Sequence, residues 1–281
     1  MDRLSRFSRR SRASSSGQRE SRVAGGRATY ALVRQLGAGS QGSVSVIRRS
    51  TDSRLLVLKR CRNSAEARRE VQILEQLRHP FIVRVHEHFV DELSSQLCIV
   101  MDYAAGGDLQ QLLDRLKASG GSLSDEQVTR VLVQLCMAIS HCHRLHVVHR
   151  DIKPANVFLT RSGANDFLAF LGDFGVSRVL ERDDPEASPG ARARRQTIAG
   201  TPYYLAPEIV AGEPYSAKSD VWSLGVLLYQ LLTIKLPFEA RSLPELARLI
   251  TEAEPAMPAK RDAQLLQAPR SCRDTPVMQP R

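Results

Sequence analysis

Short stretches in which apolar and polar residues alternate dominate residues 28–101, and they predict a small strand-rich unit. Residues 43–47, Ser-Val-Ser-Val-Ile, alternate small polar with β-branched side chains, as strands do. Residues 55–59, Leu-Leu-Val-Leu-Lys, predict an apolar strand that ends in a cation. One helix is expected from about residue 64 to residue 77, because Val71, Leu74 and Leu77 recur on one face.

Helical spacing replaces the alternation beyond residue 105. Residues 124–127, Ser-Asp-Glu-Gln, have the form of a helix start. Residues 221–232 are apolar on every side, which predicts a helix buried at the centre of a lobe, and a further helix is expected from about residue 242 to Ile250. The pattern predicts an α+β protein with a β-rich lobe at 28–104 and a helical lobe at 105–250, joined by a hinge at 101–104. The apolar positions that follow the first of these helix starts are Val128, Val131, Leu132, Leu135, Cys136 and Ile139.

Length and charge add two tails to this domain. The chain has 281 residues, and half of its net charge of +10 lies in residues 1–26, where seven arginines face Asp2 and Glu20. Residues 1–27 have almost no apolar side chains and are expected to be a disordered leader. A solvated leader, a phosphorylation or polyanion-binding arm, and a mitochondrial transit peptide remain open, although Asp2 argues against the last. Residues 251–281, rich in Ala, Pro and Arg, are expected to be an irregular tail.

Cysteine usage favours a reducing compartment. The five cysteines show no zinc-binding spacing, and Cys98 and Cys136 lie in apolar patterns that predict reduced core residues. No stretch approaches the roughly 20 apolar residues of a membrane span. These features together favour an intracellular protein, either cytoplasmic or nuclear and cytoskeletal.

A glycine run, Gly37-x-Gly39-x-x-Gly42-x-Val44, precedes the first strand. Such a run can be an ordinary flexible loop, or a dinucleotide-binding turn, which requires a helix directly after the glycines. Because a strand follows here, we interpret the run as a β-hairpin lid whose backbone N–H groups can approach phosphate.

Lys59 is the cation at the end of the second strand. A single strand lysine is most simply an edge charge that keeps the sheet soluble. Downstream of a glycine lid, we interpret it instead as the lysine that binds the α- and β-phosphates, and this role requires an acidic partner. Glu66 and Glu70 share a helix face, but Glu66 can be explained by a capping box at the helix start, so Glu70 is the predicted partner.

The polar residues with the clearest chemistry follow the helix that starts at residue 124. Any one of them could be a loop cap, but together they predict phosphoryl transfer. Asp151 would accept the proton of a substrate hydroxyl, and Lys153 would neutralise the transferred phosphoryl group. Asn156 and Asp173 offer oxygen ligands of the kind that suits a phosphate-bound Mg²⁺.

The order of these motifs resembles that of eukaryotic protein kinases over residues 28–250. Asp173-Phe174-Gly175 and Ala206-Pro207-Glu208 complete the set, and Lys153 within His-Arg-Asp-Ile-Lys-Pro is the serine/threonine form. Residues 154–159 and 200–208 are most similar to those of the NIMA-related kinases. The resemblance implies a two-lobed protein-kinase fold, ATP and Mg²⁺ as cofactors, and protein substrates that carry a Ser or Thr hydroxyl. No specific nucleic-acid partner is expected, and the oligomeric state is left open.

The resemblance also implies roles around the nucleotide. Met101 would be the gatekeeper, the backbone of residues 102–104 would hold adenine, and Asp108 would reach the ribose. Ala155 stands where kinases that select arginine near the phosphosite often have an acid, so a strongly basophilic preference is not expected. A regulatory spine of Leu74, Val85, His149 and Phe174 would be anchored by Asp220. The nucleotide-binding set is Leu36, Gly37, Gly39, Gly42, Val44, Val57, Lys59, Met101, Asp102, Ala104, Asp108 and Phe158.

The C-terminal end departs from the family pattern. A kinase lobe normally continues through two more helices, and an arginine on the last one pairs with the glutamate of Ala-Pro-Glu. Without that arginine, Glu208 is expected to lack its buried partner, which would cost about 3–5 kcal/mol. Two function classes therefore stay open: an active kinase, or a truncated or non-catalytic module that binds nucleotide or a partner.

Regulation is expected in the segment between Asp173 and Glu208. Thr197 is the predicted activating phosphosite, because a phosphate there could bridge to Arg150 and order the loop. Thr201 is the rival residue, and its position beside Pro202 suggests instead a hydroxyl contact with the catalytic residues.

Overall fold

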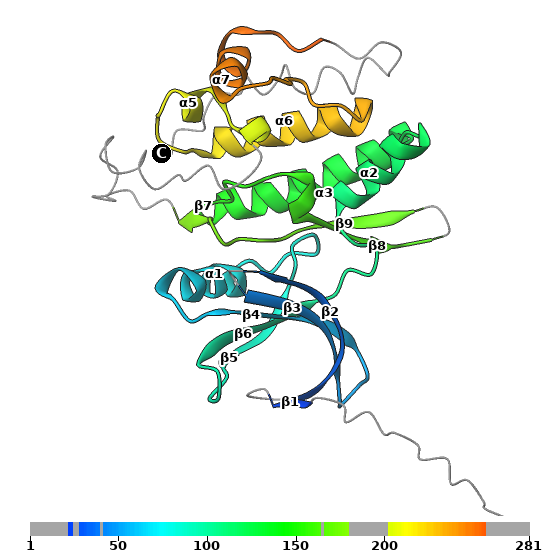
Figure 1. The fold of residues 1–281 in the computed structure, drawn as a ribbon, viewed down its shortest axis with the longest axis vertical. Coiled ribbons are helices and arrows are strands. Elements are labelled where there is room, and N and C mark those ends of the chain that lie inside the picture. The colour runs from blue at the N-terminus through cyan, green and yellow to red at the C-terminus, as the bar shows by residue number, and fades with distance from the viewer. Residues whose placement is uncertain (1–21, 25–27, 40–41, 164–165, 180–201, 257–281) are drawn as a thin grey trace, which may run out of the picture.

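The computed structural model describes residues 22–24, 28–39, 42–163, 166–179 and 202–256. Figure 1 shows a strand-rich lobe with one helix, α1 (Ala65–Gln76), and a second lobe built from helices. The predicted α+β architecture of two lobes is confirmed. No helix in the described ranges is both long enough and apolar enough to cross a membrane.

The small lobe is built on a six-stranded sheet in which every pair of neighbours is antiparallel. The order across the sheet is β1-β2-β3-β4-β6-β5. Helix α1 starts at the cap Ser64, whose side chain accepts a hydrogen bond from Ala67 N. The strands are β1 (Arg22–Ala24), β2 (Thr29–Gly39), β3 (Gly42–Arg49), β4 (Leu55–Arg62), β5 (Val85–Val90) and β6 (Gln96–Asp102).

Strand β1 corrects the expected extent of the disordered leader. Residues 22–24 were assigned to it, but they pair with β2, with Val23 opposite Tyr30. The polar composition of residues 1–27 does not predict this strand. An edge strand is held by main-chain hydrogen bonds to its neighbour, and these require no apolar pattern in the sequence. The other residues expected in the leader, 1–21, lie outside the described ranges.

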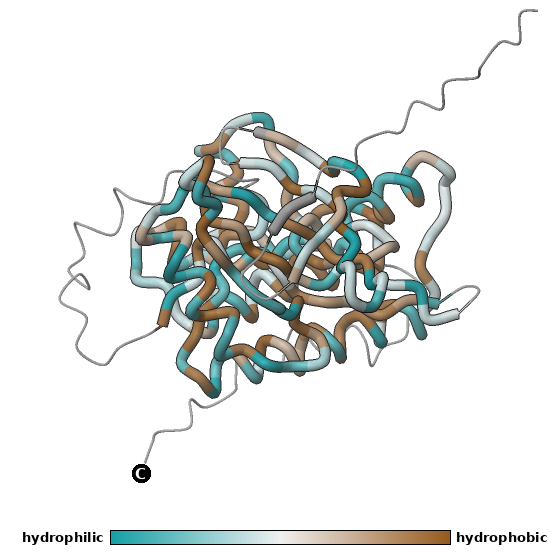
Figure 2. Tube along the Cα trace, turned by 90° about the horizontal axis from the view of Figure 1, so that it is seen from below, coloured by the Kyte–Doolittle hydropathy of each residue, from teal (hydrophilic) through white to brown (hydrophobic). Residues whose placement is uncertain are grey.

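The two faces of the sheet have different neighbours. One face encloses an apolar cluster in which Tyr30, Ile47, Leu56, Leu58, Cys98 and Val100 are at most 1% exposed. The other face packs against α1 through a smaller cluster that includes Val71 and Ile99. Figure 2 shows how hydrophobic and hydrophilic stretches alternate along the trace. Burying one large aliphatic side chain contributes about 1.5–3 kcal/mol, so these clusters stabilise the small lobe.

The larger lobe is organised around α6 (Ala217–Thr233), which is buried along most of its length, as its apolar sequence predicted. Its neighbour α3 (Asp125–Arg144) begins with the expected capping box between Ser124 and Gln127. Helix α7 ends at Glu252, two residues beyond its expected end. The remaining elements are α2 (Leu109–Ser119), β7 (Val147–Val148), β8 (Val157–Arg161), β9 (Phe167–Leu171), β10 (Arg178–Val179), α5 (Pro207–Val210), α7 (Leu243–Glu252), and the short 3₁₀ turns at Pro154–Asn156 and Pro202–Tyr204.

Two expectations about individual residues are wrong. Cys136 is exposed, because α3 buries Leu135 and Ile139 and turns the residue between them outward. Cys98 is buried with a reduced thiol, as expected. Glu208 does not lack a partner, since it is only half-buried and its Oε1 accepts a hydrogen bond from Ser219 Oγ at 2.7 Å. The penalty for a buried, unpaired carboxylate therefore does not apply.

Candidate active site

On the face of the small lobe that is directed toward the helical lobe, the apolar residues are only partly buried. Paired residues of neighbouring strands share a face, and the register sets Val44 opposite Lys59 and Val57 opposite Met101. Val44, Val57 and Met101 are only half-buried, in contrast to the fully buried cluster on the other face. An apolar surface that is left partly open between two lobes is typical of a ligand site.

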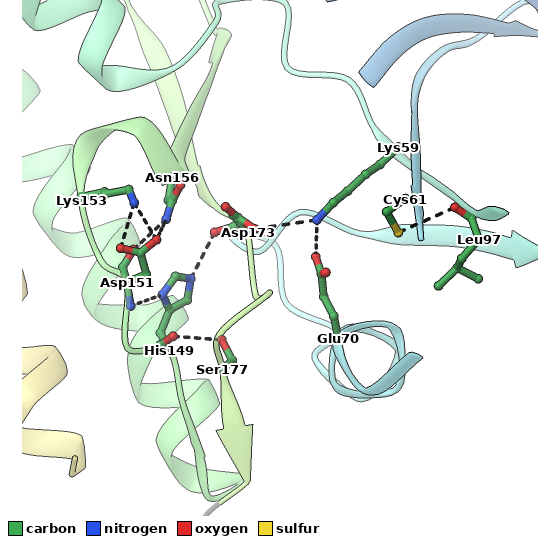
Figure 3. Close-up of polar contacts among 11 residues, drawn as sticks. Lys59, Cys61, Glu70, Leu97, His149, Asp151, Lys153, Asn156, Asp173 and Ser177 are labelled. Carbon is green, nitrogen blue, oxygen red and sulfur yellow. Dashed lines mark hydrogen bonds and ion pairs between the residues drawn. The ribbon is translucent and has the colours of Figure 1, made fainter. Parts of the chain in front are cut away.

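Lys59 reaches across this face to α1. Its Nζ donates to Glu70 Oε1 at 2.8 Å, and Glu70 is 7% exposed. Asp173 of the other lobe lies 3.8 Å from the same nitrogen (Figure 3). Burial acts to lower the pKa of Lys59, but Glu70 and Asp173 outweigh it and raise that pKa, so the amine stays charged.

Glu66, the alternative partner, is exposed in the first turn of α1. Ser64 caps the helix, which puts Glu66 at the second helical position. A capping box pairs the cap residue with Glu or Gln at the third helical position, which is Ala67 here, so Glu66 does not form the expected box with Ser64. The residue that faces Lys59 is Glu70, one helical turn further on.

The segment after β7 gathers a cation, an amide and a carboxylate. Lys153 Nζ donates to both carboxylate oxygens of Asp151, at 2.9 and 2.7 Å. Asn156 Nδ2 donates to the backbone oxygen of Asp151 at 2.8 Å and to its Oδ2 at 2.9 Å. The 3₁₀ turn Pro154–Asn156 brings Asn156 back toward Asp151, as Figure 3 shows. The Asp151 carboxylate is therefore held in one orientation by two neighbours.

A buried histidine fixes the start of this segment. His149 is fully buried, and its ring nitrogens lie 3.1 Å from Gly172 O and 3.3 Å from Asp151 N. Because Asp151 N can only donate, Nδ1 is the acceptor and Nε2 carries the proton. Burial holds the pKa of His149 below its ordinary value, despite nearby carboxylates that act in the opposite direction. His149 also packs edge-on against Phe174, with ring centroids 4.6 Å apart.

Asp220 of α6 anchors the same segment from below. It is fully buried and accepts hydrogen bonds from the backbone nitrogens of His149 and Arg150, both at 2.9 Å. His143 Nε2 lies 2.8 Å from its Oδ2. Arg150 has a φ of 70°, an unfavourable backbone conformation for a residue with a side chain, and its bond to Asp220 helps to hold it there. The implied spine residue Leu74 belongs to the same apolar cluster as Phe174, and Val85 packs against that cluster.

Asn156 and Asp173 suit a magnesium ion. Both hydrogen bonds of Asn156 use its amide nitrogen, which leaves the amide oxygen as the atom that can bind a metal. The Asp173 side chain is 48% exposed between the two lobes. Mg²⁺ binds one or two protein oxygens and completes its shell with phosphate and water, so this small donor set fits the ion. Within the described ranges, no group of three or more His, Cys, Asp or Glu side chains could hold a metal ion.

The glycines of the hairpin serve two purposes. A Cβ at Gly42 would lie 1.9 Å from Arg60 O, and its φ is 137°, so glycine is required there for β3 to pair with β4. A Cβ at Gly37 would meet nothing within 4 Å, which leaves the backbone open on that side. Gly39 ends β2 and pairs with Gly42 across the turn. Of these glycines, Gly37 therefore has open space beside its backbone.

The remaining predicted nucleotide residues lie around the hinge. Asp102 ends β6, and Ala104 follows two residues later. Leu36 is 43% exposed on β2, and Phe158 of β8 forms an isolated bridge with Asp108. Both carboxylate oxygens of Asp108 accept hydrogen bonds from Gln111 at the start of α2, so a ribose would have to share them.

Two predicted residues lie outside the described ranges, and two contacts of the site were not predicted. Thr197 and Thr201 lie outside the described residues. Arg150 lies over the ring of Tyr215, with its guanidinium carbon 5.6 Å from the centroid. Neither Tyr215 nor Ser219, the partner of Glu208, was predicted from the sequence. No local motif marks them, since each contact joins distant parts of the chain.

Comparison with known proteins agrees with this geometry. A model of the protein kinase domain matches residues 30–272. The chain is 40% identical over 237 residues to serine/threonine-protein kinase Nek2 of Homo sapiens, an alignment that covers 80% of this chain and 51% of that protein. It is 40% identical over 225 residues to Nek1 of Mus musculus, covering 77% of this chain and 17% of that protein, and 36% identical over 233 residues to Nek3 of Oryza sativa subsp. japonica, covering 80% and 37%. The chain thus spans about half or less of the length of these curated relatives. It belongs to the protein kinase family and, within that family, to the NIMA-related serine/threonine kinases.

Proposed function

We propose that this protein is an ATP-dependent serine/threonine kinase that transfers the γ-phosphate of ATP to a Ser or Thr hydroxyl of a protein substrate. The observation that carries the proposal is the arrangement around Asp151. Its carboxylate is bound by Lys153 and Asn156, while Asp173 lies within 3.8 Å of the Lys59 amine. A proton acceptor, cations and a metal-binding carboxylate thus face one another across the two lobes.

Each residue has a distinct task in this mechanism. Asp151 orients the substrate hydroxyl and accepts its proton as the oxygen attacks phosphorus. Lys153, bound to the same carboxylate, offers positive charge to the phosphoryl group during transfer. Lys59, fixed by Glu70, binds the α- and β-phosphates and sets the position of the γ-phosphate. Phosphoryl transfer needs little more than this positioning and charge stabilisation.

Protein kinases generally use ATP and Mg²⁺, and we infer that this chain binds both. A bound Mg²⁺ would supply positive charge that neutralises the phosphates. Asn156 Oδ1 and the Asp173 carboxylate are the atoms that would hold it. Leu36, Val44, Val57, Met101 and Phe158 would enclose adenine, with the backbone of residues 102–104 as its hydrogen-bonding partner.

The substrate would lie against the helical lobe. A cavity of about 330 Å³ adjoins Lys153 and is lined by parts of α2, α6 and the catalytic segment, including Ala155. Three lysines and two acids contribute to its wall, so the wall has no excess of negative charge. This balance supports the proposal that arginine near the phosphosite is not required. The lining charges are Asp114, Lys117, Lys153, Lys235 and Glu239.

Thr197 is proposed as the activating phosphosite. A phosphate there would carry about −1.5 to −2 charges and could pair with Arg150, which directly precedes the catalytic Asp151. Mass spectrometry of active protein, with kinetics of Thr197→Ala and Thr201→Ala, separates the two candidates. Full activity of Thr197→Ala would end the proposal.

An intracellular location, either cytoplasmic or nuclear and cytoskeletal, is proposed from the reduced cysteines Cys61, Cys98 and Cys142.

One experiment distinguishes the proposed kinase from the alternative, a non-catalytic module that binds nucleotide or a partner. Purified protein is incubated with Mg-ATP and a general Ser/Thr protein substrate, and transferred phosphate is measured beside an Asp151→Asn variant. The variant should bind Mg-ADP as well as the original chain does but lose at least about a hundredfold in turnover, the usual contribution of a positioned base. Nucleotide binding without transfer by the original chain would favour the non-catalytic module.

A further inference from the structure

The pairing of β5 with β6 contains an irregularity that lies beside the hinge. Val85 pairs with Met101 and Glu87 pairs with Val100, so His86 is the extra residue of a β-bulge. A bulge bends its strand and redirects the side chain of the extra residue. Here the imidazole faces Asp102, the hinge residue at the end of β6, with His86 Nε2 2.8 Å from Asp102 Oδ1.

Asp102 is held from two further directions. Arg54, which directly precedes β4, donates from Nη2 to the same Oδ1 at 2.9 Å. The backbone nitrogen of Asp102 donates to Arg84 O at 3.0 Å. The His86 side chain is only 11% exposed, so its contact is shielded from water, whereas Arg54 is 53% exposed. Side chain and main chain of this one hinge residue are therefore both fixed.

The charge state of Asp102 agrees with this geometry. Burial acts to raise the pKa of Asp102, but the hydrogen bond and electrostatic attraction of His86, together with the charge of Arg54, outweigh it and lower that pKa. The carboxylate is therefore ionised at neutral pH. Hydrogen bonds to an ionised acceptor are roughly twice as strong as neutral ones, so they orient the residue firmly.

We propose that His86 and Arg54 are positioning residues for the adenine base. They fix the Asp102 side chain, and through it the backbone of residues 102–104, in the orientation that binds adenine. This rests on the proposed nucleotide site. A hinge that is already ordered loses less conformational freedom when the nucleotide binds, which improves affinity without any direct contact. The catalytic residues Asp151 and Lys153 lie in the other lobe and do not bond to this group, so the effect belongs to nucleotide binding.

The test compares the dissociation constant for Mg-ADP, measured by calorimetry, with the KM for ATP and kcat. His86→Leu removes the ring nitrogen and keeps an apolar side chain. We expect the dissociation constant and the KM to rise about fivefold, the size of one net hydrogen bond, while kcat stays within about twofold. Hydrogen exchange at the amides of residues 102–104 should become faster in the same variant.

Two further variants make the test specific. In His86→Gln the amide nitrogen can replace Nε2, so most of the affinity should return. His88→Leu is the matched control, because His88 lies on the same strand but faces Glu75 of α1 at 3.3 Å, away from the hinge. It should bind Mg-ADP like the original chain.

The outcomes distinguish the two proposals. Unchanged Mg-ADP affinity in His86→Leu, with a lower melting temperature, would show that the contact only stabilises the lobe and would overturn this inference. If the original chain binds Mg-ADP but transfers no phosphate, the proposed activity fails while the hinge is still tested by the binding data. If the original chain does not bind Mg-ADP at all, both proposals are wrong.

Discussion

At the residue scale, the chemistry of the site depends on side chains that are each held in one orientation or one protonation state. Asp151 cannot rotate freely, because Lys153 and Asn156 both hold its carboxylate. His149 cannot take up a proton without losing the bond that its Nδ1 accepts from Asp151 N. The residue that carries the proposed proton transfer is thus oriented by a neighbour that must remain neutral.

The neutrality of His149 predicts a pH dependence of stability. Burial lowers its pKa below the ordinary value of 6.5 in the folded protein, so the unfolded chain binds a proton more readily. Its contribution to the free energy of unfolding is therefore fully present above pH 6.5 and is lost as the pH falls below that value toward the folded pKa. We expect chemical denaturation to show this decline.

Nuclear magnetic resonance of labelled imidazoles checks the residue itself. His149 should titrate below 6.5 and carry its proton on Nε2 when neutral. His79, whose pKa burial also lowers, contributes in the same direction and is distinguished by its own resonance. A His149 pKa at or above the ordinary value would contradict the account.

Sequence reasoning succeeded where the chemistry is local. Asp151, Lys153 and Asn156 lie within six residues of one another, so one short motif placed all three. The prediction that Cys136 is buried was wrong. Helical periodicity locates the buried face of a helix only to within about one residue, and Cys136 lies just outside that face. Sequence reasoning did not find the bond between Arg54 and Asp102, 48 residues apart, since that contact depends on strand register and on the bulge at His86.

At the element scale, α6 is the support on which the catalytic segment rests. Most of its buried residues are apolar, and Asp220 is the one buried residue of this helix that carries a charge. That carboxylate accepts the backbone N–H groups of two successive residues, one of them the strained Arg150. The buried charge is thus compensated by the loop that it positions.

Asp220→Asn should weaken this support. The new amide cannot accept all three bonds, which leaves a buried backbone donor unsatisfied at a cost of about 1–3 kcal/mol. We expect a loss of that size in the free energy of unfolding and a lower kcat, with a smaller change in the KM for ATP. Asp114→Asn on α2, the same chemical change at an exposed site, is the control for stability and should leave the free energy of unfolding unchanged. An Asp220→Asn variant of normal stability and kcat would show that α6 does not anchor the loop.

At the scale of the whole molecule, the proposed nucleotide site lies between two lobes that also share an apolar cluster, because Leu74 of α1 packs with residues of the helical lobe. Lys59 and Glu70 belong to one lobe, and Asp173 belongs to the other. A ligand that binds residues of both lobes should stabilise the folded chain as a whole.

Mg-ATP should therefore raise the melting temperature. Ligand at one hundred times its dissociation constant adds about 2.7 kcal/mol, which corresponds to roughly 5–10 °C for a domain of this size. Differential scanning calorimetry with and without Mg-ATP measures the shift, and Lys59→Met should show a clearly smaller one. Equal shifts in both proteins would mean that Lys59 does not bind the phosphates.

The most direct test of the proposed activity is phosphate transfer by the Asp173→Ala variant. Protein with the original sequence should transfer the γ-phosphate of labelled Mg-ATP to Ser or Thr of a protein substrate. Asp173→Ala should lose this turnover at every Mg²⁺ concentration while keeping a cooperative unfolding transition, because it removes the proposed metal ligand, a side chain that is exposed between the lobes. Asp166→Ala, which removes a carboxylate paired with Arg130 at the far end of β9, should retain full activity. Near-normal transfer by a folded Asp173→Ala variant would contradict the account.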